Sequence, residues 1–249
     1  MTGALRITLL GHGRLGSALA EGWGLTGAAT PTILTRANQP VCPAGTEALV
    51  IAVKPAQWRE AVTPLATSVP PGAVVISVMA GVRSADIASV LSRPIARVMP
   101  TTAVAKAQGV AAIWADDVEA RGVAHALFDP VADAVDLDQE ALLDPATAVA
   151  GSAPAFFHAF AQALASAGFE AGLPPEAAER LARGALRSAG AGAATDASFE
   201  DLIARIASPC GTTRAGLDAL MEARLSHAAK AAVEAAVARA RTLAGDQTS

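Results

Sequence analysis

The stretch Gly11-His12-Gly13-Arg14-Leu15-Gly16 decides the fold, because it joins a short apolar run, Arg6–Leu10, to the helix-compatible segment Ser17–Trp23. A G-x-G-x-x-G pattern between a strand and a helix is typical of dinucleotide-binding domains. The first glycine permits a tight turn, the second lets the backbone approach a pyrophosphate, and the third allows close packing of helix on strand. We therefore predict that these six residues bind a dinucleotide; a plain strand-to-helix turn is the alternative interpretation.

The end of the second predicted strand indicates which dinucleotide is bound. NAD-specific enzymes usually place Asp or Glu there, about 20 residues further on, to bind the ribose 2′-hydroxyl. Here Thr32–Leu34 leads to Thr35 and Arg36, and no acidic residue occurs before Glu47. A hydroxyl and a guanidinium suit a 2′-phosphate. Thr35 and Arg36 therefore favour NADPH, with NADH possible; the alternative is that Arg36 is a solvated residue in a turn.

The two halves of the chain have different sequence patterns. Up to about Leu143, short apolar runs alternate with Ala-rich stretches, which predicts a doubly wound parallel sheet. The predicted strands are Arg6–Leu10, Thr32–Leu34, Ala48–Val53 and Val74–Val78. From Asp144 onward the pattern is helical. We expect a Rossmann-type α/β domain over residues 1–143, followed by an all-helical domain for substrate binding and dimerisation over residues 144–249.

Four signals predict helices in the second half. Pro154–Ala171 carries apolar side chains four residues apart, as one face of a helix does. Pro175 suits the first turn of a following helix, and Ser198-x-x-Asp201 fits a capping box. Residues 214–243 consist largely of Ala, Leu, Glu, Arg and Lys, which favour helices.

Composition and charge argue against several classes of protein. A net charge of −4 without a basic cluster argues against a nucleic-acid partner. No stretch offers the roughly 20 apolar residues that span a bilayer. Cys42 and Cys210 form no disulfide or metal pattern, and the four His residues are dispersed, so we expect no metal. With no signal peptide recognisable at the start, we expect a cytoplasmic protein.

Five further motifs, in order along the chain, resemble those of the pyrroline-5-carboxylate reductases. They are Ala52-Val53-Lys54-Pro55, Ser77-Val78-Met79-Ala80-Gly81-Val82, Arg97-Val98-Met99-Pro100-Thr101-Thr102, Gly151-Ser152-Ala153-Pro154-Ala155-Phe156 and Ser208-Pro209-Cys210-Gly211-Thr212-Thr213-x-x-Gly216-Leu217. The last is close to the family's signature near its C-terminus. The sequence departs from the family's usual residues at Thr101, Ala103, Ala153, Phe156 and Cys210. The segment between Arg36 and Ala48 is also too short for the further helix and strand usual in the family.

The resemblance implies an NADPH-dependent reductase that converts 1-pyrroline-5-carboxylate to L-proline. It implies a homodimer or higher homo-oligomer assembled through the C-terminal helices. It also implies that the cofactor is contacted by a second group of residues: Ala52, Val53, Lys54, Pro55 and Ala80.

Substrate binding is expected at the segment Ser208–Thr213, whose hydroxyls and backbone N–H groups, before a helix, suit a carboxylate. The resemblance implies that Ser208, Gly211, Thr212 and Thr213 bind the substrate, and that the Thr213 hydroxyl is the catalytic group that hydrogen-bonds the ring nitrogen. A helix cap without a ligand is the alternative for this segment.

Two other functions stay open at this point. The departures at Thr101, Ala103, Phe156 and Cys210 motivate a reductase of another cyclic imine or of a keto acid. The short segment after Arg36 motivates a non-catalytic NADP-binding protein.

Overall fold

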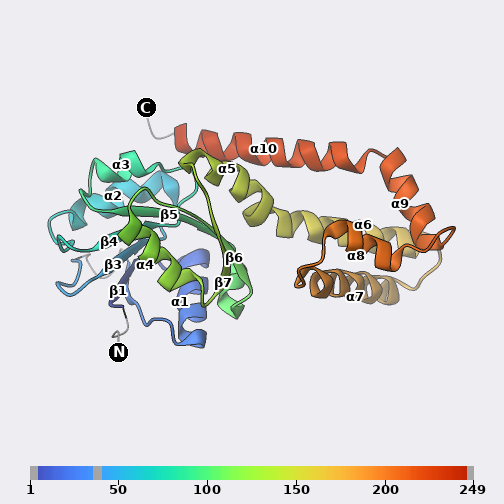
Figure 1. Ribbon diagram of the computed structural model, residues 1–249, viewed down its shortest axis with the longest axis horizontal. Helices are drawn as coiled ribbons and strands as arrows, with labels where there is room; N and C mark the ends of the chain where they lie inside the picture. Colours follow the sequence, from blue (N-terminus) through green and yellow to red (C-terminus); the bar gives the residue numbers. More distant parts are fainter. Residues whose placement is uncertain (1–4, 36–40, 246–249) are drawn as a thin grey trace. The chain divides into compact units, whose positions relative to one another are not determined.

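The protein is described here by a computed structural model, which describes residues 5–35 and 41–245. The chain forms two compact units (Figure 1). The first, the α/β unit, contains Met1–Gly151 and Ala235–Ser249; the second, the helical unit, contains Ser152–Glu234. The α/β sheet followed by helices agrees with the expected fold class, whereas the functional boundary between residues 143 and 144 stays a prediction.

A seven-stranded sheet forms the centre of the α/β unit, in the order β2-β1-β3-β4-β5-β6-β7. The strands are β1 (Ile7–Leu10), β2 (Thr32–Leu34), β3 (Ala48–Ile51), β4 (Val74–Ser77), β5 (Ile95–Pro100), β6 (Gly109–Trp114) and β7 (Ala132–Asp136). All neighbouring strands are parallel except β5 and β6, so the sheet is mostly parallel, in agreement with the predicted doubly wound sheet. Residues 101–108 are too few for a crossover, because parallel strands need a connection of a dozen or more residues.

Helices cover both faces of this sheet, which explains why every residue of β1, β3 and β4 is buried. The helices are α1 (Arg14–Thr26), α2 (Trp58–Val62), α3 (Ser84–Ala88), α4 (Val118–Phe128) and α5 (Leu143–Ala146). On one face, Trp23 of α1 and Phe128 of α4 are fully buried, and the Trp23 Nε1–H donates to the Leu127 carbonyl at 2.7 Å. On the other face, Trp58 and Ile87 are buried with the opposite side chains of the strands. The α/β unit therefore has a core on each side of the sheet.

The sheet ends at β2, next to β1. In the classic dinucleotide-binding order a further strand lies beyond this one. Among the described residues between β2 and β3, which are Thr35 and 41–47, there is neither helix nor strand. The structure therefore agrees with the short connection expected after Arg36.

The helical unit consists of α6 to α9 and the start of α10. Their bounds are α6 (Ala153–Glu170), α7 (Pro175–Ala193), α8 (Phe199–Ile206), α9 (Thr212–Glu222) and α10 (Leu225–Gly245). The predicted cap of α8 is confirmed, because the Ser198 hydroxyl accepts from the Asp201 N–H at 3.1 Å. The helical run predicted over 214–243 is two helices, separated at Arg224, whose φ is +59°.

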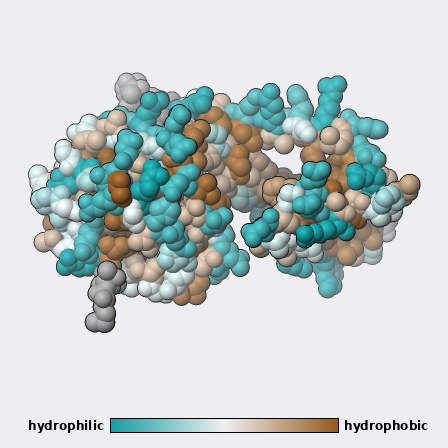
Figure 2. All heavy atoms as spheres, viewed as in Figure 1, coloured by the Kyte–Doolittle hydropathy of each residue, from teal (hydrophilic) through white to brown (hydrophobic). Residues whose placement is uncertain are grey.

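The helical unit exposes most of its large apolar side chains. Phe157, Phe199 and Ile206 are 61%, 76% and 71% exposed, whereas the buried residues among the described part of this unit are the small Ala178, Ala182 and Ala207. Brown and tan spheres accordingly lie on its surface among the teal ones (Figure 2). A single copy of the helical unit therefore lacks an apolar core of its own.

Candidate functional site

The carboxyl ends of four parallel strands meet at one edge of the sheet. Leu10 of β1 is in register with Leu34 of β2 and Ile51 of β3, and Ile51 is in register with Ser77 of β4. After β2 the chain returns to the other side of β1, so the strand order switches between β1 and β3. Ligands of open α/β sheets bind in the crevice outside such a switch point.

The Gly-rich turn that follows β1 has a different steric requirement at each glycine. Gly11 has φ +100° and donates its N–H to the Leu34 carbonyl at 2.9 Å. A Cβ on Gly11 would lie 2.7 Å from the Ala52 carbonyl oxygen, and a Cβ on Gly16 would overlap the Gly11 carbonyl. A Cβ on Gly13 would meet no protein atom within 4 Å. Protein packing therefore explains Gly11 and Gly16, and leaves open space at Gly13.

Helix α1 begins directly after this turn, with Gly13 as its N-cap. In this fully described helix no side chain caps the N-terminus and no acidic residue lies in the first turn. The first N–H groups of a helix lack intrahelical acceptors and carry the positive end of the helix dipole. His12 and Arg14 are exposed beside them. The open space at Gly13 and these N–H groups fit a phosphate-bearing ligand.

The other predicted cofactor residues follow the neighbouring strands. Thr35 follows β2 and is half-buried, whereas Arg36 lies outside the described residues. Ala52 and Val53 follow β3 and are half-buried, as is Pro55 at the start of a 3₁₀ turn. Lys54 is exposed, and Ala80 is half-buried three residues after the end of β4. Their roles toward a cofactor stay predictions.

The predicted substrate residues lie together in the helical unit, on the turn between α8 and α9. The Gly211 N–H donates to the Ser208 carbonyl at 3.1 Å, and a Cβ on Gly211 would lie 2.5 Å from the Ser208 hydroxyl oxygen. Cys210 between them has φ +59°, which is rare for a residue other than glycine. Gly211 is the N-cap of α9, and no side chain caps this helix within the described chain. The first turn of α9, with Thr212 and Thr213, therefore offers N–H groups and hydroxyls.

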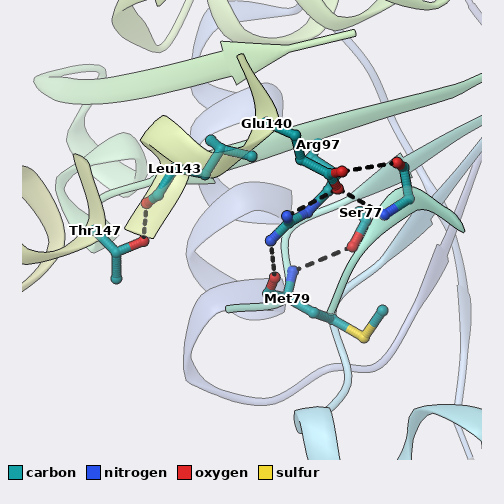
Figure 3. Close-up of polar contacts among 7 residues, drawn as sticks. Ser77, Met79, Arg97, Glu140, Leu143 and Thr147 are labelled. Carbon is teal, nitrogen blue, oxygen red and sulfur yellow. Dashed lines mark hydrogen bonds and ion pairs between the residues drawn. The ribbon is translucent and has the colours of Figure 1, made fainter. Parts of the chain in front are cut away.

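Sequence reasoning missed a buried ion pair at the carboxyl end of β4. The Arg97 Nη1–H donates to the Glu140 carboxylate at 3.0 Å, and the two side chains are 5% and 23% exposed (Figure 3). Arg97 is in register with Ser77, the last residue of β4. The signal was present in the sequence, because a charged residue in an otherwise apolar strand requires a buried partner.

Two titratable groups with shifted pKa values lie outside these sites. A hydrogen bond from the Arg6 backbone N–H lowers the pKa of the exposed Glu47. A hydrogen bond to Asp129 raises the pKa of His125, and a second one to Asp136 adds to this shift. No cluster of metal-ligating residues occurs in the described part of the chain. In the same residues, no helix has the length and apolar character needed to cross a membrane.

The sheet order and the Gly-rich turn define this chain as a dinucleotide-binding protein of the Rossmann type. A family model described as pyrroline-5-carboxylate reductase dimerisation matches residues 140–243. A pyrroline-5-carboxylate reductase from Pseudomonas aeruginosa is 34% identical over 207 residues, and the match covers 78% of this chain and 76% of that protein. The chain belongs to the pyrroline-5-carboxylate reductase family.

Other relatives extend this similarity over nearly the whole chain. The Thermus thermophilus pyrroline-5-carboxylate reductase is 39% identical over 176 residues, covering 68% of this chain and 66% of that protein. A solved pyrroline-5-carboxylate reductase from Coxiella burnetii has a TM-score of 0.86 at 25% identity and covers 96% of this chain and 98% of its own. A Plasmodium falciparum pyrroline carboxylate reductase, solved with NADP bound, has a TM-score of 0.81 at 21% identity, with coverage of 96% and 98%.

Proposed function

We propose that the protein reduces the C=N bond of 1-pyrroline-5-carboxylate to give L-proline, with NADPH as the reductant. Membership of the family supports this reaction. The observation that carries the assignment to this chain is the start of α9, where Gly211 lies against the Ser208 side chain and no side chain caps the helix in the described residues. Free N–H groups at that position suit the carboxylate next to the imine.

The Gly-rich turn and α1 would hold the cofactor. The space at Gly13 and the uncapped first turn of α1 fit its pyrophosphate. Thr35 and Arg36 follow β2, where a hydroxyl and a guanidinium suit the 2′-phosphate of NADPH. Ala52 to Pro55 and Ala80 would line the nicotinamide side of the same edge, since they follow β3 and β4.

The chemistry requires little from the protein beyond positioning. When bound, the nicotinamide supplies a hydride to the imine carbon, and the ring nitrogen ends as the protonated amine of proline. The protonated imine is already electrophilic, so no metal and no strong acid is needed. The N–H groups in the first turn of α9, at Thr212 and Thr213, would hold the carboxylate, and the Thr213 hydroxyl would hydrogen-bond the ring nitrogen and orient the C=N bond.

We also propose that the protein works as a homodimer through its helical unit, with a small imine carboxylate as its substrate. The match of residues 140–243 to a dimerisation domain supports this assembly. The exposed Phe157, Phe199 and Ile206 support it as well, because association with a second copy would remove large apolar side chains from water. Cys42 and Cys210 are both free, which suits the cytoplasm as the site of the reaction.

The decisive experiment follows NADPH oxidation by the purified protein with 1-pyrroline-5-carboxylate, and identifies the product. A parallel reaction with NADH measures the cofactor preference. Formation of proline, faster with NADPH, is the expected result. If the protein binds NADPH but forms no proline, the proposed reaction is wrong, and reduction of other cyclic imines or keto acids decides whether it is a reductase at all.

A further inference from the structure

The segment that follows β4 is held at both of its ends by one partly buried network. At its start, the Met79 carbonyl accepts from the Arg97 Nη2–H at 3.5 Å, and the Met79 N–H donates to the Ser77 hydroxyl at 3.5 Å (Figure 3). At its end, the Glu140 carboxylate accepts from the Ser84 N–H at 2.6 Å and from the Ser84 hydroxyl at 3.1 Å. The Arg97–Glu140 ion pair joins these two ends.

The residues between these two anchors form part of the predicted cofactor edge. Ala80 lies among them, and Gly81 turns the chain with φ +75°. The segment follows the carboxyl end of β4, two strands from β1 in the sheet, so it belongs to the edge that the Gly-rich turn occupies. Apart from helix α3, which begins at Ser84, no regular element fixes its path. The network, together with the buried side chains of Met79 and Val82, therefore fixes where the backbone around Ala80 lies.

A contribution to the stability of the fold does not by itself explain why this network is present. Arg97 is nearly fully buried, and its Nε–H has no hydrogen-bond partner among the described residues. Burying a charge costs solvation energy, and apolar residues of similar volume often replace a buried ion pair without loss of stability or with a gain. Met99 lies on the same face of β5 as Arg97 and packs with the apolar side chains of Trp114 and Leu143. An apolar pair at positions 97 and 140 would suit these surroundings.

We propose that Arg97 and Glu140 are positioning residues that hold the Met79–Ser84 segment in the shape required to receive the nicotinamide half of the cofactor. This inference rests on the proposed function for the identity of the cofactor. The pair acts through the Met79 carbonyl and through Ser84, so its effect falls on cofactor binding and on hydride transfer rather than on the folding of the chain.

The test replaces both charged members of the network by apolar residues, which leaves no unpaired charge. The Arg97→Met/Glu140→Leu protein is expected to unfold at a temperature equal to or above that of the wild type. Its Kd and KM for NADPH are expected to rise about tenfold, because small misplacements at a site have effects of this size or larger. The KM for the imine should stay within twofold. Arg97→Lys keeps the charge opposite Glu140 and should recover part of the NADPH affinity.

A matched control comes from a second arginine with the same kinds of partner. Arg121, on α4, donates to the Ala115 carbonyl at 2.6 Å and to the Asp136 carboxylate at 2.9 Å, and neither partner belongs to the Met79–Ser84 segment. Arg121→Met/Asp136→Asn should therefore leave NADPH binding unchanged within twofold.

Binding is measured by NADPH fluorescence without substrate, so the result does not depend on turnover. A folded Arg97→Met/Glu140→Leu protein that binds NADPH as the wild type does would overturn the inference. If that protein does not fold, the Arg97→Lys protein provides the test. A Kd for NADPH equal to that of the wild type in this variant would also overturn the inference. A wild type that binds NADPH but reduces no imine contradicts the proposed function, and leaves this comparison of Kd values valid.

Discussion

A methyl group on Gly11 would lie 2.7 Å from the carbonyl oxygen of Ala52, because the backbones that follow β1 and β3 approach each other closely. Gly11 also has φ +100°, which side chains rarely tolerate. Gly13, two residues away, has an ordinary φ of −78° and open space where a Cβ would point. The fold therefore requires glycine at position 11, whereas we expect the ligand to require it at position 13.

Gly11→Ala and Gly13→Ala are expected to fail in different ways. Gly11→Ala should lower the free energy of unfolding by roughly 1–3 kcal/mol, the usual cost of backbone strain. Gly13→Ala should leave it within about 0.5 kcal/mol, as surface substitutions do, and weaken NADPH binding instead. Thermal unfolding and NADPH titration of both proteins check this. Unchanged NADPH affinity in Gly13→Ala would contradict the approach of the pyrophosphate at this glycine.

Cys210→Gly should stabilise the turn between α8 and α9. The φ of +59° at Cys210 costs a residue with a Cβ about 1–2 kcal/mol, and glycine removes this cost but loses more entropy on folding. We expect a net gain of up to about 1 kcal/mol in the free energy of unfolding, measured by denaturant titration. Cys210→Ala keeps the strain and serves as the control; an equal gain in both variants would show that the thiol, and not the backbone, is responsible.

Thr213→Val should reduce turnover far more than cofactor affinity. Valine has nearly the shape of threonine and lacks the hydroxyl that we assign to the ring nitrogen of the substrate. A lost hydrogen bond of about 1.4 kcal/mol or more in the transition state lowers kcat/KM at least tenfold. Steady-state kinetics beside an NADPH titration measures both effects. Equal losses of turnover and of NADPH affinity would mean that Thr213 supports the structure rather than the substrate.

His125 should stabilise the α/β unit in a pH-dependent manner. Its ring bonds Asp129 and Asp136, and Asp136 also bonds Arg121. These bonds raise the pKa of His125 in the folded state above its ordinary value. A group whose pKa rises on folding contributes fully below its unfolded pKa, and loses that contribution as the pH rises through its folded pKa. Wild type should therefore exceed His125→Gln in unfolding temperature more at about pH 6 than at about pH 9. A constant difference across this range would show that protonation of His125 does not matter.

Much of the fold was predictable because local patterns decided it. Short, mostly apolar runs predicted β1, β3 and β4, and the Ser198 cap predicted the start of α8. The antiparallel β6 was not predicted, since its direction depends on the length of the connection and on pairing with β5 rather than on the strand itself. The break at Arg224 was missed because no glycine or proline marks it.

The candidate sites were predictable to a different degree. The residues of the Gly-rich turn were found from their spacing, which a steric requirement at each glycine explains. The Arg97–Glu140 pair was missed because its partners are 43 positions apart, and such a pairing exists only once the sheet has formed. Ser84, which completes the network, carries no signal of its own in the sequence.

The exposed apolar surface of the helical unit has a consequence for how the protein withstands dilution. Since its described buried residues are small alanines, a homodimer formed through this unit would bury apolar surface that a single copy leaves exposed, and would thereby stabilise these helices. Its unfolding then obeys mass action, so the unfolding temperature rises with protein concentration. Dilution would therefore lower the folded fraction and the activity together, and the concentration of the protein becomes one of the conditions that keep it folded.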